Sequence, residues 1–161
     1  MKLYMKQKVF SWRDRFYIKN EFGEDVYYIE GELFSLGKKL HIFDMTGREL
    51  AFVQEKIFSF VPRFFVFVNE RQIAEIVKKI TFFKPKYEVA GLGWSVEGSF
   101  LAHDYSIFEK GREIVRIHKA WMSWGDSFEI DIDGSKDIAV ALAVVLAIDC
   151  VLDRASKSST N

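Results

Sequence analysis

The chain has 161 residues, of which 49% are hydrophobic, 16% aromatic and 29% charged, with 10 glycines and 2 prolines. This composition excludes disordered, collagen-like and low-complexity proteins, and the length predicts a single domain. Basic and acidic residues both number 23, so no overall charge favours nucleic acid or an anionic membrane, and any such role requires a local patch.

From Leu3 to Ile132 the sequence consists of short apolar runs, many of them alternating, that are interrupted about every ten residues by turn signals. This pattern is typical of a mainly β protein. Turns rich in Asn, Asp and Gly separate the runs of four predicted hairpins, at residues 20–25, 44–47, 69–71 and 109–111. The number of runs predicts about eleven or twelve strands.

Two parts of this β region resemble each other. Segment 28–50 is similar to segment 94–114, and Gly31 and Gly47 match Gly98 and Gly111 at offsets of 67 and 64 residues. The ordered matches predict two similar β halves, at about 17–83 and 87–134, within one domain that spans 1–155.

Residues 137–154 interrupt the β pattern. Their 11 apolar residues, 138–148, include four alanines, which favours a helix. We expect Ser135 to cap its first amides, Asp137 and Arg154 to complement the helix dipole, and 156–161 to form a flexible tail.

A helix that is apolar on every side must be surrounded by apolar groups. Eleven residues span roughly 17 Å, too little for a hydrocarbon core of about 30 Å, and Asp149 interrupts the run, so we predict no transmembrane segment. A sheet of eleven or twelve strands could instead close around one helix. We expect inward-facing aromatic residues, including many of the 16 phenylalanines, to pack on its alanines.

The sequence YIEGELFSLGKKLHIFDMTGREL at 28–50, followed by QEK at 54–56 and PRFF at 62–65, resembles the LURP-one-related family of the tubby C-terminal-like superfamily. The apolar C-terminal helix also resembles that family. The resemblance implies a closed twelve-stranded antiparallel β barrel around a central C-terminal helix, shared with tubby domains and related to phospholipid scramblases. Tubby domains bind phosphoinositides through basic surface residues, but no matching motif assigns those residues here.

No residue pattern predicts catalysis, a cofactor or a metal. His41, His103 and His118 are isolated from one another, and no Cys or His lies at metal-ligand spacing from them. Nucleophile and phosphate-binding motifs are missing from the sequence. Cys150, the single cysteine, is expected to be a core thiol and indicates a reducing, cytoplasmic environment, and residues 1–20 lack the apolar stretch of a signal peptide.

An acidic run precedes the helix. Glu129, Asp131 and Asp133 share one parity, so they should lie on the outer face of the last strand while Phe128, Ile130 and Ile132 face inward. Weak calcium binding is the alternative, although the spacing is not that of an EF-hand.

Charge is unevenly distributed along the chain. Residues 1–20 carry six basic and one acidic side chain, 71–90 carry five and two, and 120–153 carry one and seven. Cations interleaved with aromatic residues could bind an anionic lipid surface. The candidate ligand-binding residues are Arg13, Arg15, Lys78, Lys79, Phe82, Phe83, Lys84 and Lys86.

We therefore expect a non-enzymatic binding or scaffold module, cytoplasmic or peripheral at the membrane. Its predicted ligand is an anionic phospholipid such as a phosphoinositide, or a protein partner, and not nucleic acid. One alternative is a scramblase-like lipid transporter, which would require the helix to enter a bilayer. The other is a small enzyme with its active site at one end of the barrel.

Overall fold

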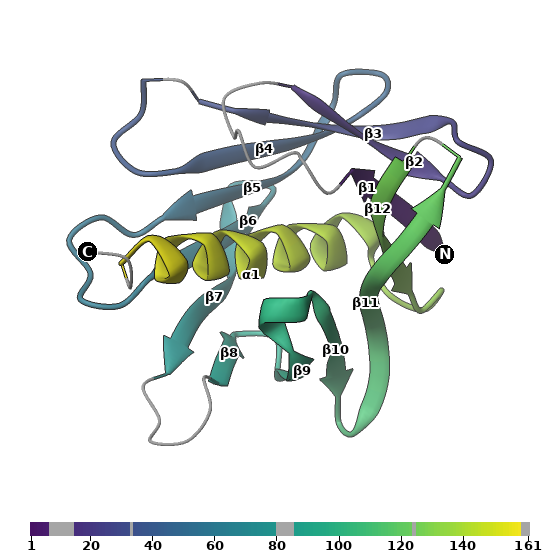
Figure 1. Ribbon diagram of the computed structural model, residues 1–161. Coiled ribbons are helices and arrows are strands. Elements are labelled where there is room, and N and C mark those ends of the chain that lie inside the picture. Colours follow the sequence, from purple (N-terminus) through teal and green to yellow (C-terminus); the bar gives the residue numbers. More distant parts are fainter. Residues whose placement is uncertain (7–14, 33, 80–85, 124, 159–161) are drawn as a thin grey trace.

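The computed structural model describes residues 1–6, 15–32, 34–79, 86–123 and 125–158. It contains twelve strands, a short 3-10 helix η1 (Phe100–Ala102) and one long helix α1 (Ile138–Ser158) (Figure 1). The strands are β1 (Lys2–Lys6), β2 (Phe16–Asn20), β3 (Asp25–Gly31), β4 (Lys39–Asp44), β5 (Glu49–Glu55), β6 (Arg63–Val68), β7 (Arg71–Lys79), β8 (Lys86–Ala90), β9 (Trp94–Ser99), β10 (Asp104–Glu109), β11 (Arg112–Met122) and β12 (Gly125–Ile132).

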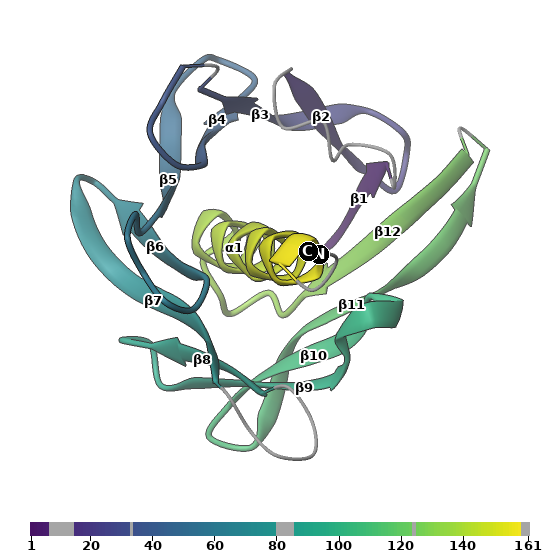
Figure 2. The ribbon, with the colours of Figure 1, turned by 60° about the vertical axis from the view of Figure 1, so that its left-hand side comes forward.

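The strands form one closed barrel. Each strand pairs with the next along the chain, and β1 pairs antiparallel with β12 to close the circle. Viewed nearly along its axis, α1 lies in the middle of the ring of strands (Figure 2). The predicted fold class, a mainly β closed twelve-stranded antiparallel barrel around a hydrophobic C-terminal helix, is confirmed.

Asp137, and not Ser135, caps α1. The Asp137 carboxylate accepts a hydrogen bond from the Val140 backbone N–H at 3.0 Å. The prediction for Ser135 is wrong because its hydroxyl donates to Asp133 instead, at 2.6 Å, within the turn that precedes the helix.

The other end of α1 differs from the expectation as well. The helix continues through Ser158, so residues 156–158 of the expected tail are helical. Two ion pairs hold this last part of α1 against the barrel wall: Lys38 contacts Asp153 at 2.8 Å, and Arg154 contacts Glu55 at 2.7 Å. These pairs keep the last turns of the helix beside the wall.

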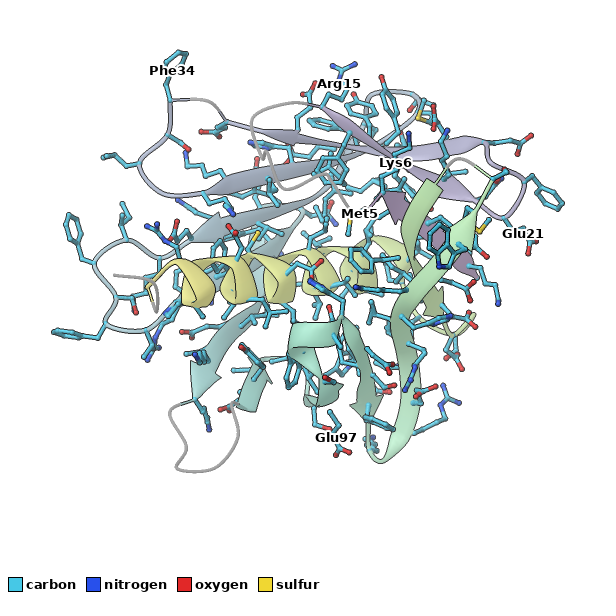
Figure 3. All side chains as sticks on the ribbon, in the orientation of Figure 1. Met5, Lys6, Arg15, Glu21, Phe34 and Glu97 are labelled. Atoms are coloured by element: carbon cyan, nitrogen blue, oxygen red, sulfur yellow. The ribbon has the colours of Figure 1, made fainter. Side chains whose placement is uncertain are left out.

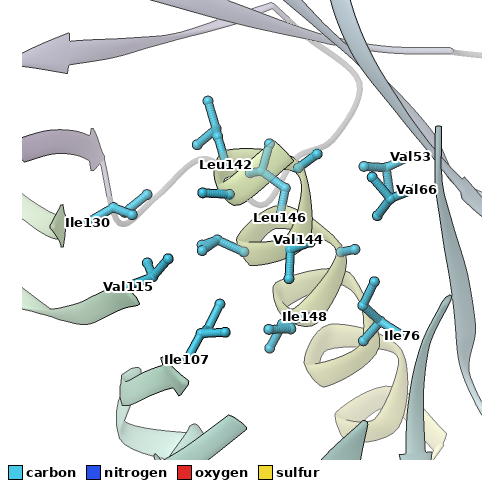
Figure 4. Close-up of a cluster of buried hydrophobic side chains, with 14 of the residues drawn as sticks. Val53, Val66, Ile76, Ile107, Val115, Ile130, Leu142, Val144, Leu146 and Ile148 are labelled. Carbon is cyan, nitrogen blue, oxygen red and sulfur yellow. The ribbon is translucent and has the colours of Figure 1, made fainter. Parts of the chain in front are cut away.

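Aliphatic side chains fill the space between α1 and the wall. Residues 141–148 of α1 are all completely buried. They face branched side chains from opposite sides of the barrel, such as Val53 and Val66 on one side and Ile107, Val115 and Ile130 on the other (Figure 4). Because the helix occupies the lumen, only about one layer of side chains fits between it and the strands.

The prediction that the phenylalanines mainly pack on the helix is wrong. Among the described residues, only Phe16, Phe64, Phe100 and Phe128 belong to the buried core. Other rings lie on the outer face, where neighbouring strands bring them together. Successive pairs there are Tyr17 and Tyr28 (6.2 Å between ring centroids), Tyr28 and Phe43 (4.9 Å), His41 and Phe52 (4.6 Å), and Phe52 and Phe67 (5.7 Å). Such cross-strand pairs stabilise a sheet from outside.

The two ends of the barrel carry different connections. Because consecutive strands are antiparallel, every connection after an odd-numbered strand lies at one end and every connection after an even-numbered strand at the other. The ion pairs of Asp153 and Arg154 place the first set where α1 ends, which we call the helix-exit end. Arg112, which donates to Ser135 at 2.9 Å, places the second set where α1 begins, the helix-entry end.

A polar cluster closes the barrel between β1 and β12. The Glu129 carboxylate accepts hydrogen bonds from the Lys2 ammonium at 2.7 Å and from the Tyr4 hydroxyl at 2.8 Å. Burial alone would raise the pKa of Glu129, but these two hydrogen bonds and the charge of Lys2 outweigh burial and hold the pKa below its ordinary value of 4.5. Glu129 therefore stabilises the barrel in its ionised form.

Because Glu129 acts in its ionised form, the stability of the barrel should depend on pH. Because the pKa of Glu129 is lower in the folded than in the unfolded chain, its contribution is complete above pH 4.5 and disappears as the pH falls through the folded value. Glu129→Gln should lower the free energy of unfolding at neutral pH by roughly 1.5–3 kcal/mol, the usual worth of hydrogen bonds to a charged group. Urea unfolding should show this difference shrinking at acid pH; a difference that is independent of pH would contradict the assignment.

Candidate functional site: the helix-exit end

The structure separates the predicted ligand-binding residues. Arg15 precedes β2, where it donates to Glu30 at 2.6 Å and lies over the Tyr28 ring, 4.5 Å from its centroid. Lys79 ends β7 and forms an ion pair with Glu88. Four strands lie between β2 and β7 in one direction around the barrel and six in the other, so Arg15 and Lys79 are on nearly opposite sides of the barrel. Arg13, Phe82, Phe83 and Lys84 lie outside the described residues, and of Lys86 only the backbone is described.

These positions nevertheless share one end of the molecule. Lys79 ends β7 and Lys86 begins β8 at the helix-exit end, and Arg15 immediately precedes β2 at the corresponding end of that strand. Lysines and arginines from other connections join them. We call the group around the end of α1 the basic rim: Lys38, Lys39, Lys56, Arg63, Lys79 and Lys86. Lys6 and Arg15 lie farther from the end of α1 (Figure 3).

Most described members of the basic rim have a carboxylate partner. Lys38 is paired with Asp153 at 2.8 Å, Lys39 with Glu32 at 3.0 Å and Arg63 with Glu75 at 2.8 Å. Hydrogen bonds from His41 and then Lys39 hold the pKa of Glu32 below its ordinary value, so this carboxylate is ionised at neutral pH. The Lys38–Asp153 pair is largely shielded from solvent, with each side chain 17% exposed, whereas the more exposed pairs of Lys39 and Arg63 contribute little to stability, which leaves these two cations able to exchange partners.

Acidic residues predominate at the helix-entry end. Asp133 hydrogen-bonds Ser135, which lowers the pKa of its carboxyl, and Glu109 is likewise held below its ordinary pKa by Lys136 and Trp94. Carboxylates in or beside the turns at this end are Glu21, Glu24, Asp25, Asp44, Glu49, Glu70, Glu109, Asp131, Asp133 and Asp137. Basic side chains at this end are fewer: Lys2, Lys19, Arg48, Arg71, Lys110, Arg112 and Lys136. Carboxylates such as Glu32, Glu55 and Asp153 also lie at the helix-exit end, so the two ends differ in their balance of charge and not in the sign of every group.

Two loops at the helix-exit end also carry exposed apolar side chains, which the sequence analysis did not single out. Phe34 lies in the β3–β4 loop with Leu36, which is 80% exposed. Phe58 and Phe60 lie in the β5–β6 loop beside the partly exposed Ile57. The three phenylalanines are fully exposed, and Figure 3 shows Phe34 pointing away from the barrel. The sequence does contain a sign of the second loop: segment 57–62 forms a turn, where polar residues are usual, yet it is apolar except for Ser59.

Inside the same end, three polar side chains meet. The Tyr105 hydroxyl donates to Asp149 at 3.4 Å, and His103 Nδ1 lies 3.6 Å from the same carboxylate oxygen. Burial and the charge of Asp149 raise the pKa of Tyr105 well above its ordinary value. Because Asp149 and Tyr105 are buried, this cluster connects α1 to the η1 and β10 segment and gives a substrate no access to either group.

The remaining candidates for chemistry have structural surroundings. His41 lies between Glu32 and Glu49, 3.0 Å from each, on the outer face. Cys150 is completely buried, and burial raises the pKa of its thiol so that it is unreactive. Within the described ranges, no group of three His, Cys, Asp or Glu side chains could hold a metal ion.

The acidic run of β12 has the predicted orientation, but its outer face is not solvated throughout, because Glu129 is buried. Phe128, Ile130 and Ile132 are buried on the inner face. On the outer face, Glu129 bonds Lys2 and Tyr4, and Asp131 lies 3.6 Å from the N-terminal ammonium. The carboxylates considered for calcium thus have partners within the protein.

Comparison with known proteins agrees with this architecture. The sequence profile of the LURP-one-related family matches residues 1–149, so this chain is a member of that family. Uncharacterized protein YxjI of Bacillus subtilis (strain 168) is 32% identical over 152 residues, which cover 94% of each chain. The X-ray structure of the Arabidopsis thaliana protein AT5G01750 has the same fold, with a TM-score of 0.66 and 17% identity over 93% of this chain and 90% of that one.

Proposed function

We propose that this LURP-one-related protein is a non-enzymatic module that binds anionic phospholipid surfaces through its basic rim. The observation that carries the proposal is the gathering of strand-end cations at the helix-exit end, opposite an acidic end. A bilayer containing phosphoinositide or phosphatidylserine presents many phosphates, and each cation near it contributes on the order of 1 kcal/mol. The acidic end would turn the molecule so that the basic rim faces the lipid.

The contacts of the basic rim allow its cations to exchange a carboxylate partner for a lipid phosphate. Lys39 and Arg63 lie in surface ion pairs, which are weak in water, so a lipid phosphate can replace the carboxylate at small cost. Lys56 has no carboxylate partner among the described residues and lies 5.9 Å from the Phe65 ring centroid.

Charge reversal tests the proposal. The Lys79→Glu, Lys84→Glu, Lys86→Glu variant should sediment with phosphoinositide vesicles on the order of 100-fold more weakly than the wild type, because three attractive charges become repulsive. The control variant reverses the same number of charges at the helix-entry end, with Arg48→Glu, Arg71→Glu and Lys110→Glu, and should bind like the wild type. Equal binding by all three proteins, or none by the wild type, would refute a lipid-binding role for the rim.

The scramblase-like alternative would require α1 to leave the barrel. Residues 141–148 of α1 are completely buried among the strands, so its release would expose the core of the protein. Of the helices in the described part of the chain, none is long and apolar enough to span a membrane. A lipid-flip assay in reconstituted vesicles distinguishes this alternative from surface binding.

A further inference from the structure

Three fully exposed phenylalanines of the helix-exit end are grouped on neighbouring loops, whereas Trp121, which is 86% exposed, lies apart from them in β11. Phe34 belongs to the β3–β4 loop, and Phe58 and Phe60 belong to the β5–β6 loop. The loops adjoin because Lys38 and Glu55 are hydrogen-bonded to each other: the Glu55 N–H donates to the Lys38 carbonyl at 2.8 Å, and the Lys38 N–H donates to the Glu55 carboxylate at 2.8 Å. Apolar tips on two separate connections are thus held at the same edge of the barrel.

Both loops have a defined base beneath their tips. The Lys56 N–H donates to the Arg63 carbonyl at 2.9 Å, which closes the β5–β6 loop below Phe58 and Phe60. The Lys38 ammonium bonds Asp153 of α1 and ties the β3–β4 loop to the helix. Phe58 has a φ of 57°, a left-handed conformation that is unfavourable for a ring-bearing residue.

Three fully exposed rings on adjoining loops form an apolar patch of the kind that marks a protein or membrane contact. The rings are fully exposed on loops, so a folded protein partner would need a pocket for each ring. A fluid hydrocarbon phase can surround all of them at once. Lys56 lies at the base of the β5–β6 loop, at the level where lipid phosphates would lie, and the nearby carboxylates of Glu55 and Asp153 are paired with Arg154 and Lys38.

We propose that Phe34, Phe58 and Phe60 insert into the outer part of an anionic bilayer and anchor the barrel with the end of α1 towards the membrane. This inference rests on the proposed function and adds a mode of attachment to it. In this arrangement the side chains of Leu36 and Ile57 also contact the hydrocarbon of the bilayer, while the basic rim contacts the lipid phosphates. The helix-entry end, with its carboxylates, then faces away from the anionic surface.

A single labelled position can report insertion. Because Cys150 is buried and unreactive, a Ser59→Cys variant offers one accessible thiol between Phe58 and Phe60 for an environment-sensitive fluorophore. On vesicles of phosphatidylcholine with phosphatidylserine, its emission should shift to the blue, and lipids that carry a quencher near the headgroup should quench it. The same label on Glu21→Cys, at the helix-entry end (Figure 3), should show neither effect.

A matched variant tests whether the rings anchor the protein. Phe34→Ser, Phe58→Ser and Phe60→Ser together should weaken vesicle binding at least about tenfold and abolish the part of the binding that resists high salt, because that part is apolar. Phe22→Ser, at a turn of the helix-entry end where the ring is 78% exposed, should bind like the wild type. Thermal melting should be the same for all these proteins, since no core side chain changes.

The outcomes separate the two proposals. If the wild type sediments with anionic vesicles while the Ser59→Cys label keeps its aqueous emission and the triple serine variant binds fully, insertion is wrong and surface binding stands. If the wild type does not sediment, both proposals fail. If the serine substitutions instead convert an oligomer to a monomer and leave lipid binding unchanged, the rings serve self-association and the insertion is refuted.

Discussion

Leu146→Ala is expected to lower the free energy of unfolding by roughly 2–5 kcal/mol, the usual cost of removing a completely buried leucine side chain. Leu146 lies near the middle of α1 and is completely buried in the core cluster of Figure 4. The surrounding strands are held in a closed ring of hydrogen bonds, so they cannot collapse into the space that the side chain leaves. The cost should therefore lie towards the upper part of the range.

Urea unfolding followed by circular dichroism measures this effect, and Leu36→Ala is the matched control. Leu36 is 80% exposed, so the same substitution there should change the stability by no more than about 0.5 kcal/mol. A loss at Leu146 as small as that at Leu36 would mean that α1 is not enclosed. A loss of the expected size also argues against release of the helix into a bilayer, because release would forfeit all such contacts together.

Gly98→Ala is expected to be about as damaging, for a different reason. Gly98 lies in β9 opposite Tyr105 with a φ of 134°, in the region that side chains rarely adopt. A β-carbon at this position would lie 2.6 Å from the backbone oxygen of Asp104 and 2.6 Å from Tyr105 Cα. Neither backbone atom can move without disrupting the pairing of β9 and β10, so we expect a loss of roughly 3 kcal/mol or more.

Gly111→Ala is the control that separates the clash of the new β-carbon from the strain of a side chain at positive φ. Gly111 also has a positive φ, 80°, but a β-carbon there would meet nothing within 4 Å. Its substitution should cost only about 1–2 kcal/mol, the usual penalty for a left-handed side chain. Thermal melting of the two variants should show this order, and equal losses would contradict the close approach of β9 and β10.

The sequence contained enough information to determine the architecture. The alternation of apolar residues and the Asn, Asp and Gly turns mark the strands locally, because both depend on backbone geometry within a few residues. The apolar surface of 138–148 leaves no solvent-facing side, so enclosure follows from the hydrophobic effect and from a length too short for a membrane. The orientation of Glu129 and Asp131 followed from the two-residue period of a strand in the same way.

Where apolar residues lie on both faces of a strand, only the tertiary structure decided which face turns inward. In β6, with the sequence RFFVFV, both faces are apolar, so periodicity cannot choose between them. The structure places Phe64 and Val66 inside and Phe65 and Phe67 outside, where Phe67 pairs with Phe52. The choice depends on the narrow space between α1 and the wall, which is a property of the whole barrel.

The candidate site also depended on tertiary structure. Phe34 and Phe58 are separated by a hairpin in the sequence, and nothing local indicates that their loops adjoin. Antiparallel pairing of consecutive strands brings alternate connections to one end and thereby collects the rings and the cations of the basic rim there. The sequence by itself determined which segments form strands and which helix must be covered, because these follow from short-range periodicity. Only the folded barrel decided which side chains gather at each end, because that depends on long-range pairing such as β1 with β12.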